Sequence, residues 1–476
     1  MQFSTFNSNY LRILRWFIII QPILDILTTL SIYYIDLSIT VGIIVRMLFM
    51  LLTLIYIFFG NDSIYKKYVI TYLLLLFVVL GIGFIVNMLS KPIFNLFLEV
   101  QWIAKIVFFI TMFCSFIVIF SSNLDFQKSK MKILKSAYMA MIVVVASIAI
   151  SIVTNTSGDT YEWVKTGYKG WFFSGNELGA IIAITLPLVF LFAIIKTNSL
   201  RDFKFWFLPL ALAFTGVFLG TKVGLFAVIG TFVLVFISIL LHWISKVRSI
   251  GIKNQHTANF VYTVAALIIF LFVLPLTPSV NNLTVDMPIP EKDNIVAEEG
   301  EEDSTSEENN ENSEEQTLPE QTEDEEAREL PAFLDSEIVN KVLSSRHFYF
   351  TRQFYQYEDA NLLQKFVGMG YAGNYTNTRK TIEMDFLDIF FSFGIIGSIL
   401  IFLPLLLLIG VLLKRVFTSF TEVIQMQNIM LLTSILLGNG IALIAGHVWF
   451  APAVSIYFSI SMVILFYNLK SKETTY

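Results

Sequence analysis

The chain has 476 residues, of which 56% are hydrophobic and only 14% are charged, and its mean hydropathy is +0.70. A soluble domain carries roughly 25% charged residues, so this composition excludes a soluble globular protein and indicates a membrane protein. The single cysteine, Cys114, lies in an apolar run, which excludes a disulfide within the chain. The net charge of -5 is distorted by residues 291–327, which contain 17 acidic residues and one lysine. That segment alone carries -16, so the rest of the chain is about +11.

The apolar runs predict an all-α polytopic membrane protein, because a spanning helix needs about 20 mostly apolar residues. The first run continues to about Tyr34 without a small-residue cleavage site, so we expect a span there rather than a removed signal peptide. The seventh run is short and its boundary is poorly marked. The twelve expected spans are 13–33, 37–59, 68–88, 98–121, 134–154, 176–196, 205–220, 223–245, 259–277, 387–411, 427–446 and 449–468.

The lysines and arginines between the spans predict the orientation, because positive charge concentrates on the cytoplasmic side. With the N-terminus in the cytoplasm, the inner segments hold 18 positive residues: Arg12, Arg15, Lys66, Lys67, Lys128, Lys130, Lys132, Lys135, Lys196, Arg201, Lys204, Lys246, Arg248, Lys253, Lys414, Arg415, Lys470 and Lys472. The short outer loops hold four: Lys91, Lys165, Lys169 and Lys222. We therefore expect both termini in the cytoplasm.

This topology divides the chain into spans one to nine (1–277), one large extracytoplasmic loop (278–386), and spans ten to twelve with a cytoplasmic tail (387–476). Within the loop, residues 291–327 contain no aromatic residue and should be a disordered acidic spacer, although a cation-binding role is conceivable. Residues 330–385 contain many apolar residues and should fold on the mouth of the bundle. We expect a helix there, capped by Asp335 or Ser336 and running to about Tyr357, and then broken by the glycine-rich run at 368–373.

The chemically useful residues gather on the expected outer side. The four histidines are scattered, which predicts no metal site, and no nucleotide motif faces the cytoplasm. Three outer features stand out. They are GWFFSGNELG at 170–179, LGTKVG at 219–224, and the large loop with Arg346, Arg352, GMGYAG and the sequence Glu383-Met384-Asp385-Phe386-Leu387-Asp388.

The order of these features resembles the O-antigen ligase and polymerase superfamily of bacterial envelope proteins. That family has Gly-Phe-x-x-x-Asn opening a middle span, Gly-Ser/Thr-Arg two spans later, and then a large outer loop with an Arg, a Gly-x-Gly and a His-Asn-x-x-Leu element. Here the matching positions are Phe172 to Asn176, Thr221-Lys222, Arg346, Gly368 to Gly370, and Glu383 to Leu387 with Gly394 and Gly397. The resemblance covers roughly 165–410. Lys222 replaces the usual Arg, and Glu383 replaces the usual His.

The resemblance implies glycan transfer from a polyprenyl-diphosphate donor to a glycan acceptor at the outer face of a bacterial cytoplasmic membrane, without a cofactor. It implies catalytic roles for Glu383, Asp385 and Arg346. Arginine and lysine suit the phosphates of the leaving group, and a carboxylate suits a general base. The expected substrate-binding residues are Lys222, Arg352, Asn176, Glu177 and His447. Membrane lipids are the other expected partners, nucleic acid is not one, and the oligomeric state is left open.

Each of these residues also has a structural interpretation. The acids at 383, 385 and 388 favour a helix dipole, and Asn176 or Glu177 would cap the sixth span. Lys222 would reach the membrane interface, Arg346 would pair with Glu337, and His447 would be a satisfied interfacial residue. Four charges fall inside spans, and the partnerships open to them are Asp25 with Arg46, and Glu99 with Lys105, which lie six apart and so do not form a direct helical pair.

Several functions remain open from the sequence. We favour a surface polysaccharide polymerase over a ligase, because the family's histidine is missing at position 383. A polysaccharide or lipid-linked-glycan transporter or flippase is an alternative, although the two halves show no internal repeat. A non-enzymatic membrane sensor or assembly protein would leave the loop Arg and carboxylates without a role. A wall polymerase of the shape, elongation and division family would use the same donor but typically has ten spans.

Overall fold

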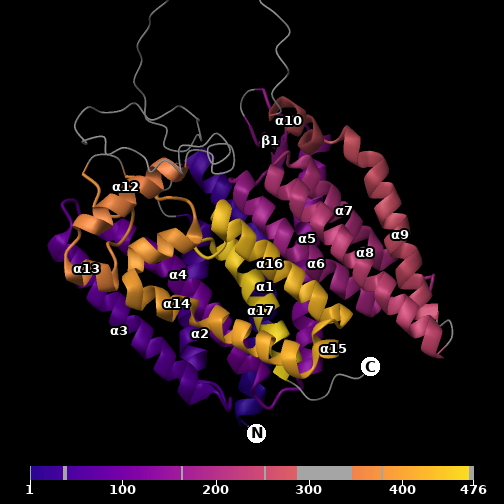
Figure 1. Ribbon diagram of the computed structural model, residues 1–476, viewed down its shortest axis with the longest axis horizontal. Coiled ribbons are helices and arrows are strands. Elements are labelled where there is room, and N and C mark those ends of the chain that lie inside the picture. The colour runs from indigo at the N-terminus through magenta and orange to yellow at the C-terminus, as the bar shows by residue number, and fades with distance from the viewer. Residues whose placement is uncertain are drawn as a thin grey trace, which may run out of the picture.

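The computed structural model describes residues 2–35, 40–161, 164–250, 254–286, 346–376 and 379–470, and these residues form an almost entirely helical molecule (Figure 1). The acidic segment 291–327 and the expected helix start at Asp335 or Ser336 lie outside them. The helices are α1 (Gln2–Ile35), α2 (Val41–Phe59), α3 (Lys66–Ser90), α4 (Leu96–Phe120), α5 (Phe126–Val153), α6 (Gly175–Lys196), α7 (Lys204–Phe218), α8 (Lys222–Ile250), α9 (Asn254–Val273), α10 (Pro278–Asp286), α12 (Arg346–Asp359), α13 (Leu362–Val367), α14 (Asp385–Thr418), α15 (Phe420–Val423), α16 (Met426–Ile444) and α17 (Pro452–Lys470).

Eleven helices of the described residues are long and apolar enough to cross a membrane, and α7 is a shorter apolar helix. The expected all-α polytopic fold is therefore confirmed. The eleven helices correspond to eleven of the twelve expected spans, and α7 occupies the expected seventh. At 15 residues α7 would extend only about 22 Å, which is less than the roughly 30 Å hydrocarbon core of a bilayer.

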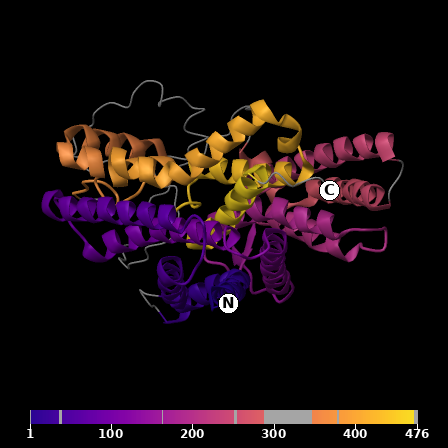
Figure 2. The same ribbon diagram turned by 90° about the horizontal axis from the view of Figure 1, so that it is seen from below.

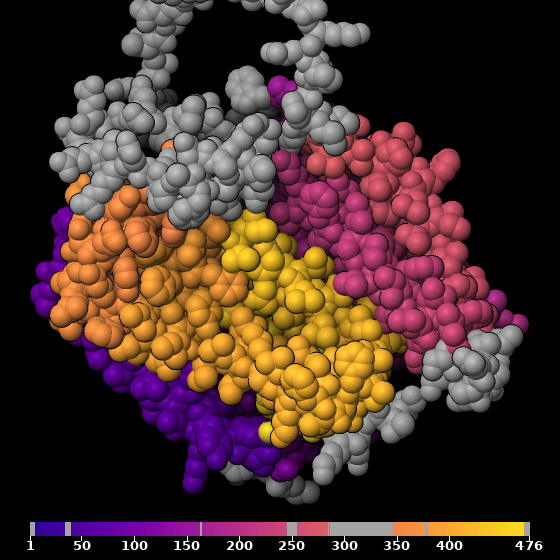
Figure 3. All heavy atoms as spheres, viewed as in Figure 1, coloured from indigo at the N-terminus to yellow at the C-terminus, as the bar shows by residue number. Residues whose placement is uncertain are grey.

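Three helices form the interior of the bundle. In α6, α17 and α4, respectively 94%, 83% and 78% of the most apolar window is buried, whereas α9 buries only 22%. Small and hydroxylated residues allow this close packing. Gly438 of α16 faces the ring of Phe458, and the hydroxyl of Ser434 donates to the carbonyl of Ile184 at 2.7 Å. Figure 3 shows the C-terminal helices between the N-terminal helices and the α7–α9 group.

One end of the bundle collects the start of α1, the α2–α3 loop, the start of α5 and the end of α17. The side chain of Asp62 accepts hydrogen bonds from Asn7 and from Asn123. Lys470 contacts the hydroxyl of Tyr65. We call this the terminal end. The predicted topology places all these segments on one side of the membrane.

The opposite end carries the α3–α4, α5–α6, α7–α8 and α16–α17 connections together with α10, α12 and α13 (Figure 1). We call it the site end. A two-stranded hairpin, β1 (Gly158–Asp159) and β2 (Tyr168–Gly170), lies between α5 and α6. Asn282 of α10 joins two of these loops, because its side chain bonds both main-chain polar atoms of Thr166 and the carbonyl of Gly220.

The described part of the long loop packs on the bundle as α12 and α13. The helix expected to run to Tyr357 is observed as α12, which ends at Asp359. The short α13 was not expected from the sequence; it begins because Asn361 caps it, its side chain accepting from the N–H of Gln364. α13 lies against α3 and α14, and Figure 2 shows this layer stacked on the N-terminal helices.

Candidate functional site

The turn entering α14 is folded by the carboxylate of Asp388. Its two oxygens accept hydrogen bonds from the N–H groups of Ile382 and Met384 at 2.9 and 3.1 Å. Met384 occupies the N-cap position but has no capping side chain, so Asp388 satisfies the main chain in its place. This arrangement fixes the position of Glu383, which lies between the two donors.

Asp385, the first residue of α14, ties this helix to the loop between α16 and α17. Its carboxylate accepts from the N–H groups of His447, Val448 and Trp449 at 3.0, 2.8 and 2.7 Å. Asp385 and Asp388 are only 2% and 3% exposed. Both carboxylates are thus buried and bonded to the main chain, and they hold the turn before α14 and the α16–α17 loop in place.

Glu383 differs from these two acids because it forms ion pairs with side chains. Its oxygens lie 3.3 Å from a guanidinium nitrogen of Arg346 and 3.1 Å from the ammonium of Lys380. Burial acts to raise the pKa of Glu383, but the charges of Lys380, His447 and Arg346 outweigh it and hold that pKa below its ordinary value of 4.5. The carboxyl is therefore ionised at neutral pH, and its side chain remains 21% exposed.

His447 lies in the loop between α16 and α17, and its charge acts on Glu383. Its Nδ1 lies 2.9 Å from the carbonyl of Ala445, while Nε2 has no hydrogen bond to any described residue. Burial acts to lower the pKa of His447, but the charge of Glu177, the Ala445 carbonyl, and the charges of Glu383 and Asp385 outweigh it. That pKa is therefore raised above 6.5, which favours the imidazolium.

The backbone is strained at two of these residues. Glu383 has φ 62° and His447 has φ 64°, and both are non-glycine residues in the left-handed region. Such residues are uncommon, and the strain persists only where surrounding contacts impose it. Here the bonds from Asp385 and Asp388 impose it on the two segments that carry Glu383 and His447.

The glycine run of the loop is held against α4 by a buried ion pair. The ammonium of Lys91 lies 2.6 Å from Glu99 and also donates to the carbonyl of Tyr371 at 2.7 Å. The other oxygen of Glu99 accepts from the Tyr371 N–H at 3.0 Å. Gly370 has φ 74°, and a Cβ there would stand 2.5 Å from Glu99. The expected pairing of Glu99 with Lys105 is therefore wrong: the two residues are six apart on one helix and face different directions, and Lys91 supplies the partner.

The first two sequence features meet each other at the site end. Gly179 of α6 lies against Leu219, Thr221 and Val223, so the α7–α8 loop packs on the first turns of α6. Ser174 is the N-cap of α6, accepting from the N–H of Glu177, which corrects the expectation that Asn176 or Glu177 caps this helix. The charge of Glu177 acts on His447, in the α16–α17 loop.

The remaining expected residues divide into two groups. Arg352 of α12 donates to the carbonyl of Lys380 at 3.2 Å, so it lies beside the Glu383 pair. Lys222 opens α8 with an exposed side chain. Neither Lys222 nor Asn176 is among the bonded partners of Glu383.

The chain matches the family model described as O-antigen ligase like membrane protein over residues 7–472, nearly its whole length. The chain belongs to this family. No curated protein and no solved structure matches it. The resemblance drawn from the outer motifs is thereby confirmed, and the family match extends it from roughly 165–410 to all the spans.

Sequence reasoning missed one residue of this candidate site, namely Lys380. The sequence pattern that could have identified Lys380 is its position three residues before Glu383, because this spacing brings the two charges together in the structure. Among the described residues, no group of three His, Cys, Asp or Glu side chains could hold a metal ion.

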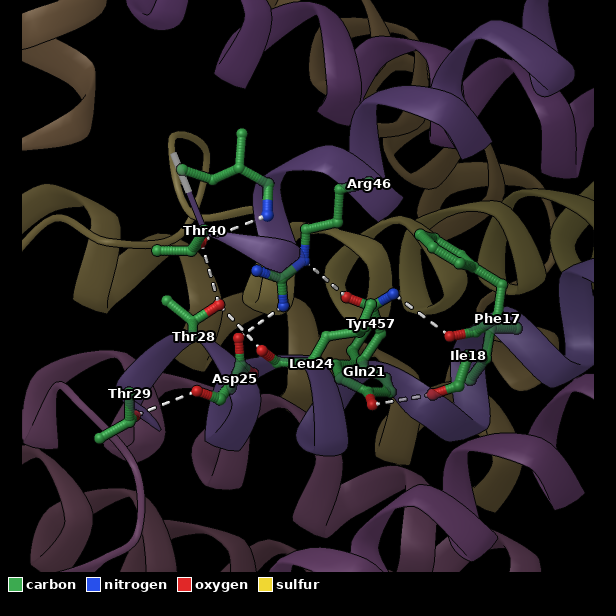
Figure 4. A network of polar contacts seen from close by, with 11 residues as sticks. Phe17, Ile18, Gln21, Leu24, Asp25, Thr28, Thr29, Thr40, Arg46 and Tyr457 are labelled. Atoms are coloured by element: carbon green, nitrogen blue, oxygen red, sulfur yellow. Dashed lines mark hydrogen bonds and ion pairs between the residues drawn. The ribbon is translucent and has the colours of Figure 1, made fainter. Parts of the chain in front are cut away.

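The expected pair of Asp25 and Arg46 is confirmed, within a network between α1 and α2 (Figure 4). The guanidinium of Arg46 donates to Asp25 at 2.5 Å and, through Nε, to Gln21 at 3.0 Å. The charge of Glu177, at the start of α6, also acts on Asp25.

Proposed function

We propose that this O-antigen ligase-like protein transfers glycan from a polyprenyl-diphosphate donor to a glycan acceptor at the outer face of a bacterial cytoplasmic membrane. The observation that carries this proposal is the ion pair between Arg346 and Glu383, a partly accessible cation and carboxylate held together by a folded loop. Family membership supports glycosyl transfer, and the lysine and arginine distribution supports placing the site end outside.

The reaction needs positive charge beside the leaving group. An acceptor hydroxyl attacks the anomeric carbon, the bond from that carbon to the diphosphate oxygen breaks, and its electron pair stays on the diphosphate. Arg346, Arg352, Lys380 and His447 surround Glu383 with the cations that such an anion requires. Arginine offers two parallel donors to phosphate oxygens, which also orients the donor.

Glu383 is the proposed general base that takes the proton of the acceptor hydroxyl. Without substrate, its ion pairs hold its pKa low, which makes the carboxylate a weak base. When a diphosphate binds Arg346 and Lys380, those cations turn to the phosphates and the basicity of Glu383 rises. The base thus becomes stronger only when the donor is present. Asp385 and Asp388 act as positioning residues, because their oxygens already bond the main chain.

Within this reaction class we favour a polymerase of surface polysaccharide repeat units over a ligase that transfers a finished chain. The position that carries histidine in the family motif holds Glu383, and this departure supports a branch separate from the lipopolysaccharide ligases. Both activities would use the same donor chemistry, so they are distinguished by the lipid-linked product that accumulates when the protein is absent.

The test is mass spectrometry of lipid-linked glycans in cells lacking the gene, rescued by wild type, Arg346→Ala or Arg415→Ala. Arg415 is the matched control, because it forms an Arg–Glu pair of similar length with Glu422, 3.2 Å, at the end of α14 away from Glu383. Single repeat units on the lipid are expected to accumulate without the gene, and Arg415→Ala should rescue whereas Arg346→Ala should not.

Other outcomes have definite meanings. Accumulation of long lipid-linked chains would establish a ligase instead. An unchanged lipid-linked pool and surface glycan would overturn glycan transfer and favour a transporter or an assembly protein. Rescue by both variants, at equal membrane levels, would show that the site lies elsewhere.

A further inference from the structure

Lys105 lies inside α4 and forms no ion pair with the residues that the structure describes. Its ammonium lies 5.6 Å from the ring centroid of Trp102, and it has no carboxylate within 4.0 Å among the described residues. The acid expected to pair with it, Glu99, is bonded to Lys91 instead. An ionisable group inside a membrane span is costly and is usually paired or functional. Because no described carboxylate pairs with Lys105, its presence in the span requires another explanation.

The contacts of Trp102 place this lysine beneath the site. The indole of Trp102 stacks on Phe450, with ring centroids 3.9 Å apart and planes at 16°, and its N–H donates to Ser392 at 3.0 Å. Phe450 lies three residues after His447 in the loop held by Asp385. Lys105 lies one further turn along α4, about 4.5 Å deeper in the bundle.

The charged groups around Lys105 also belong to the site end of the bundle. The negative charges of Glu177 and Asp385 act on Lys105, and the charge of Glu177 also acts on His447. The oxygens of Asp385 already accept three main-chain hydrogen bonds. Lys105, Glu177 and His447 all remain partly exposed, although the segment of α4 that follows Lys105 is buried. Lys105 is thus a largely buried cation beside Trp102, and the charges of Glu177 and Asp385 act on it.

We propose that Lys105 binds the diphosphate of the lipid donor from the membrane side, opposite the cations of the loop. This inference rests on the proposed function and adds a donor-binding residue to it. A polyprenyl chain lies in the membrane, so its diphosphate enters the site from the side of the spans. Lysine presents three donors on a flexible stem and can follow the phosphates as negative charge grows on the leaving oxygen.

The test measures binding, in nanodiscs, of undecaprenyl diphosphate and of undecaprenol, which has the same lipid chain without the phosphates. Lys105→Met is expected to weaken diphosphate binding about tenfold, as the loss of one charge-assisted bond does, and to leave undecaprenol binding unchanged. Lys105→Arg should retain most of the affinity. The control is Lys130→Met, since Lys130 is a buried lysine on α5, near Asn468 of α17. It should leave both affinities unchanged.

The thermal unfolding temperature of each variant is measured as the control for correct folding. If Lys105→Met unfolds, Lys105→Gln, which keeps a polar side chain without the charge, keeps the comparison possible. Equal diphosphate affinity of wild type and Lys105→Met overturns the inference, and so does an equal loss of undecaprenol binding. Both results leave glycan transfer standing, since that is decided by the lipid-linked glycans in cells.

Discussion

The carboxylate of Asp385 accepts a 2.7 Å hydrogen bond from the N–H of Trp449, 64 residues further along the chain. The same carboxylate bonds the N–H groups of His447 and Val448, so the start of α14 and the α16–α17 loop form one unit. The segments that carry Glu383 and His447 are therefore held together by an acid whose printed hydrogen bonds all go to the main chain.

Replacing Asp385 with Asn should destabilise this unit. The amide keeps one acceptor oxygen, so at least one of the three buried N–H groups loses its partner, at about 1–3 kcal/mol. We expect a lower thermal unfolding temperature in detergent and loss of transfer activity. Asp125→Asn is the control, since Asp125 caps α5 and Asn caps a helix equally well. Normal stability and activity of Asp385→Asn would contradict the positioning role.

The sequence predicted the spans well, but it predicted the site only in part. The pairing of Asp25 with Arg46 follows from opposite charges in adjacent spans, which explains why it was found. The meeting of Asp385 with the His447 loop depends on how α14, α16 and α17 pack, and no local pattern encodes it. The error over Glu99 has the same origin, since Lys91 reaches it only because the α3–α4 loop folds back.

Removing the charge of Glu383 should abolish transfer without unfolding the protein. General-base catalysis contributes about 10²–10⁴-fold, so Glu383→Gln should lower kcat by that factor. Glu383→Asn is the sharper variant, because Asn tolerates the left-handed backbone at φ 62° better than most residues. Turnover of the lipid-linked donor by purified protein measures both. Wild-type turnover of either variant would assign the base to another residue.

Stability should fall on both sides of neutral pH, for separate reasons. The pKa of Glu383 is lowered, so its stabilisation is present above pH about 4.3 and is lost as pH falls through the lower folded pKa. The pKa of His447 is raised, so its stabilisation is present below pH about 6.5 and is lost as pH rises through the higher folded pKa. Thermal unfolding between pH about 2 and about 9 covers the range below the unfolded pKa of Glu383 and above that of His447, and so records both changes.

The variant His447→Asn distinguishes the loss of stability at alkaline pH from the loss at acid pH. Asn suits the left-handed backbone of His447 and does not titrate. The alkaline loss of stability should therefore disappear, while the acid loss remains because Arg346 and Lys380 still pair with Glu383. An unchanged alkaline arm would show that another group titrates there.

Deleting residues 291–327 should leave activity largely intact. These residues lie outside the described part of the chain, and their composition predicts a solvated acidic spacer. The expected result is normal surface polymer at normal membrane levels. Complete loss of polymer at unchanged protein level would show that the segment contributes to the reaction or to a partner.

Breaking the pair of Asp25 and Arg46 should destabilise the α1–α2 hairpin more than removing both charges. Arg46→Leu leaves the buried carboxylate of Asp25 without its cation, which costs about 3–5 kcal/mol for pairs of this kind. The double variant Asp25→Leu/Arg46→Leu has no unpaired charge and should recover most of the loss. Membrane protein level and thermal unfolding temperature measure the difference. If the double variant folds but remains inactive, the network also contributes to the site through its coupling of Asp25 to Glu177. If the double variant is no more stable than Arg46→Leu, the loss does not come from an unpaired charge on Asp25. The hydrogen bond from Arg46 to Gln21 would then account for the stability.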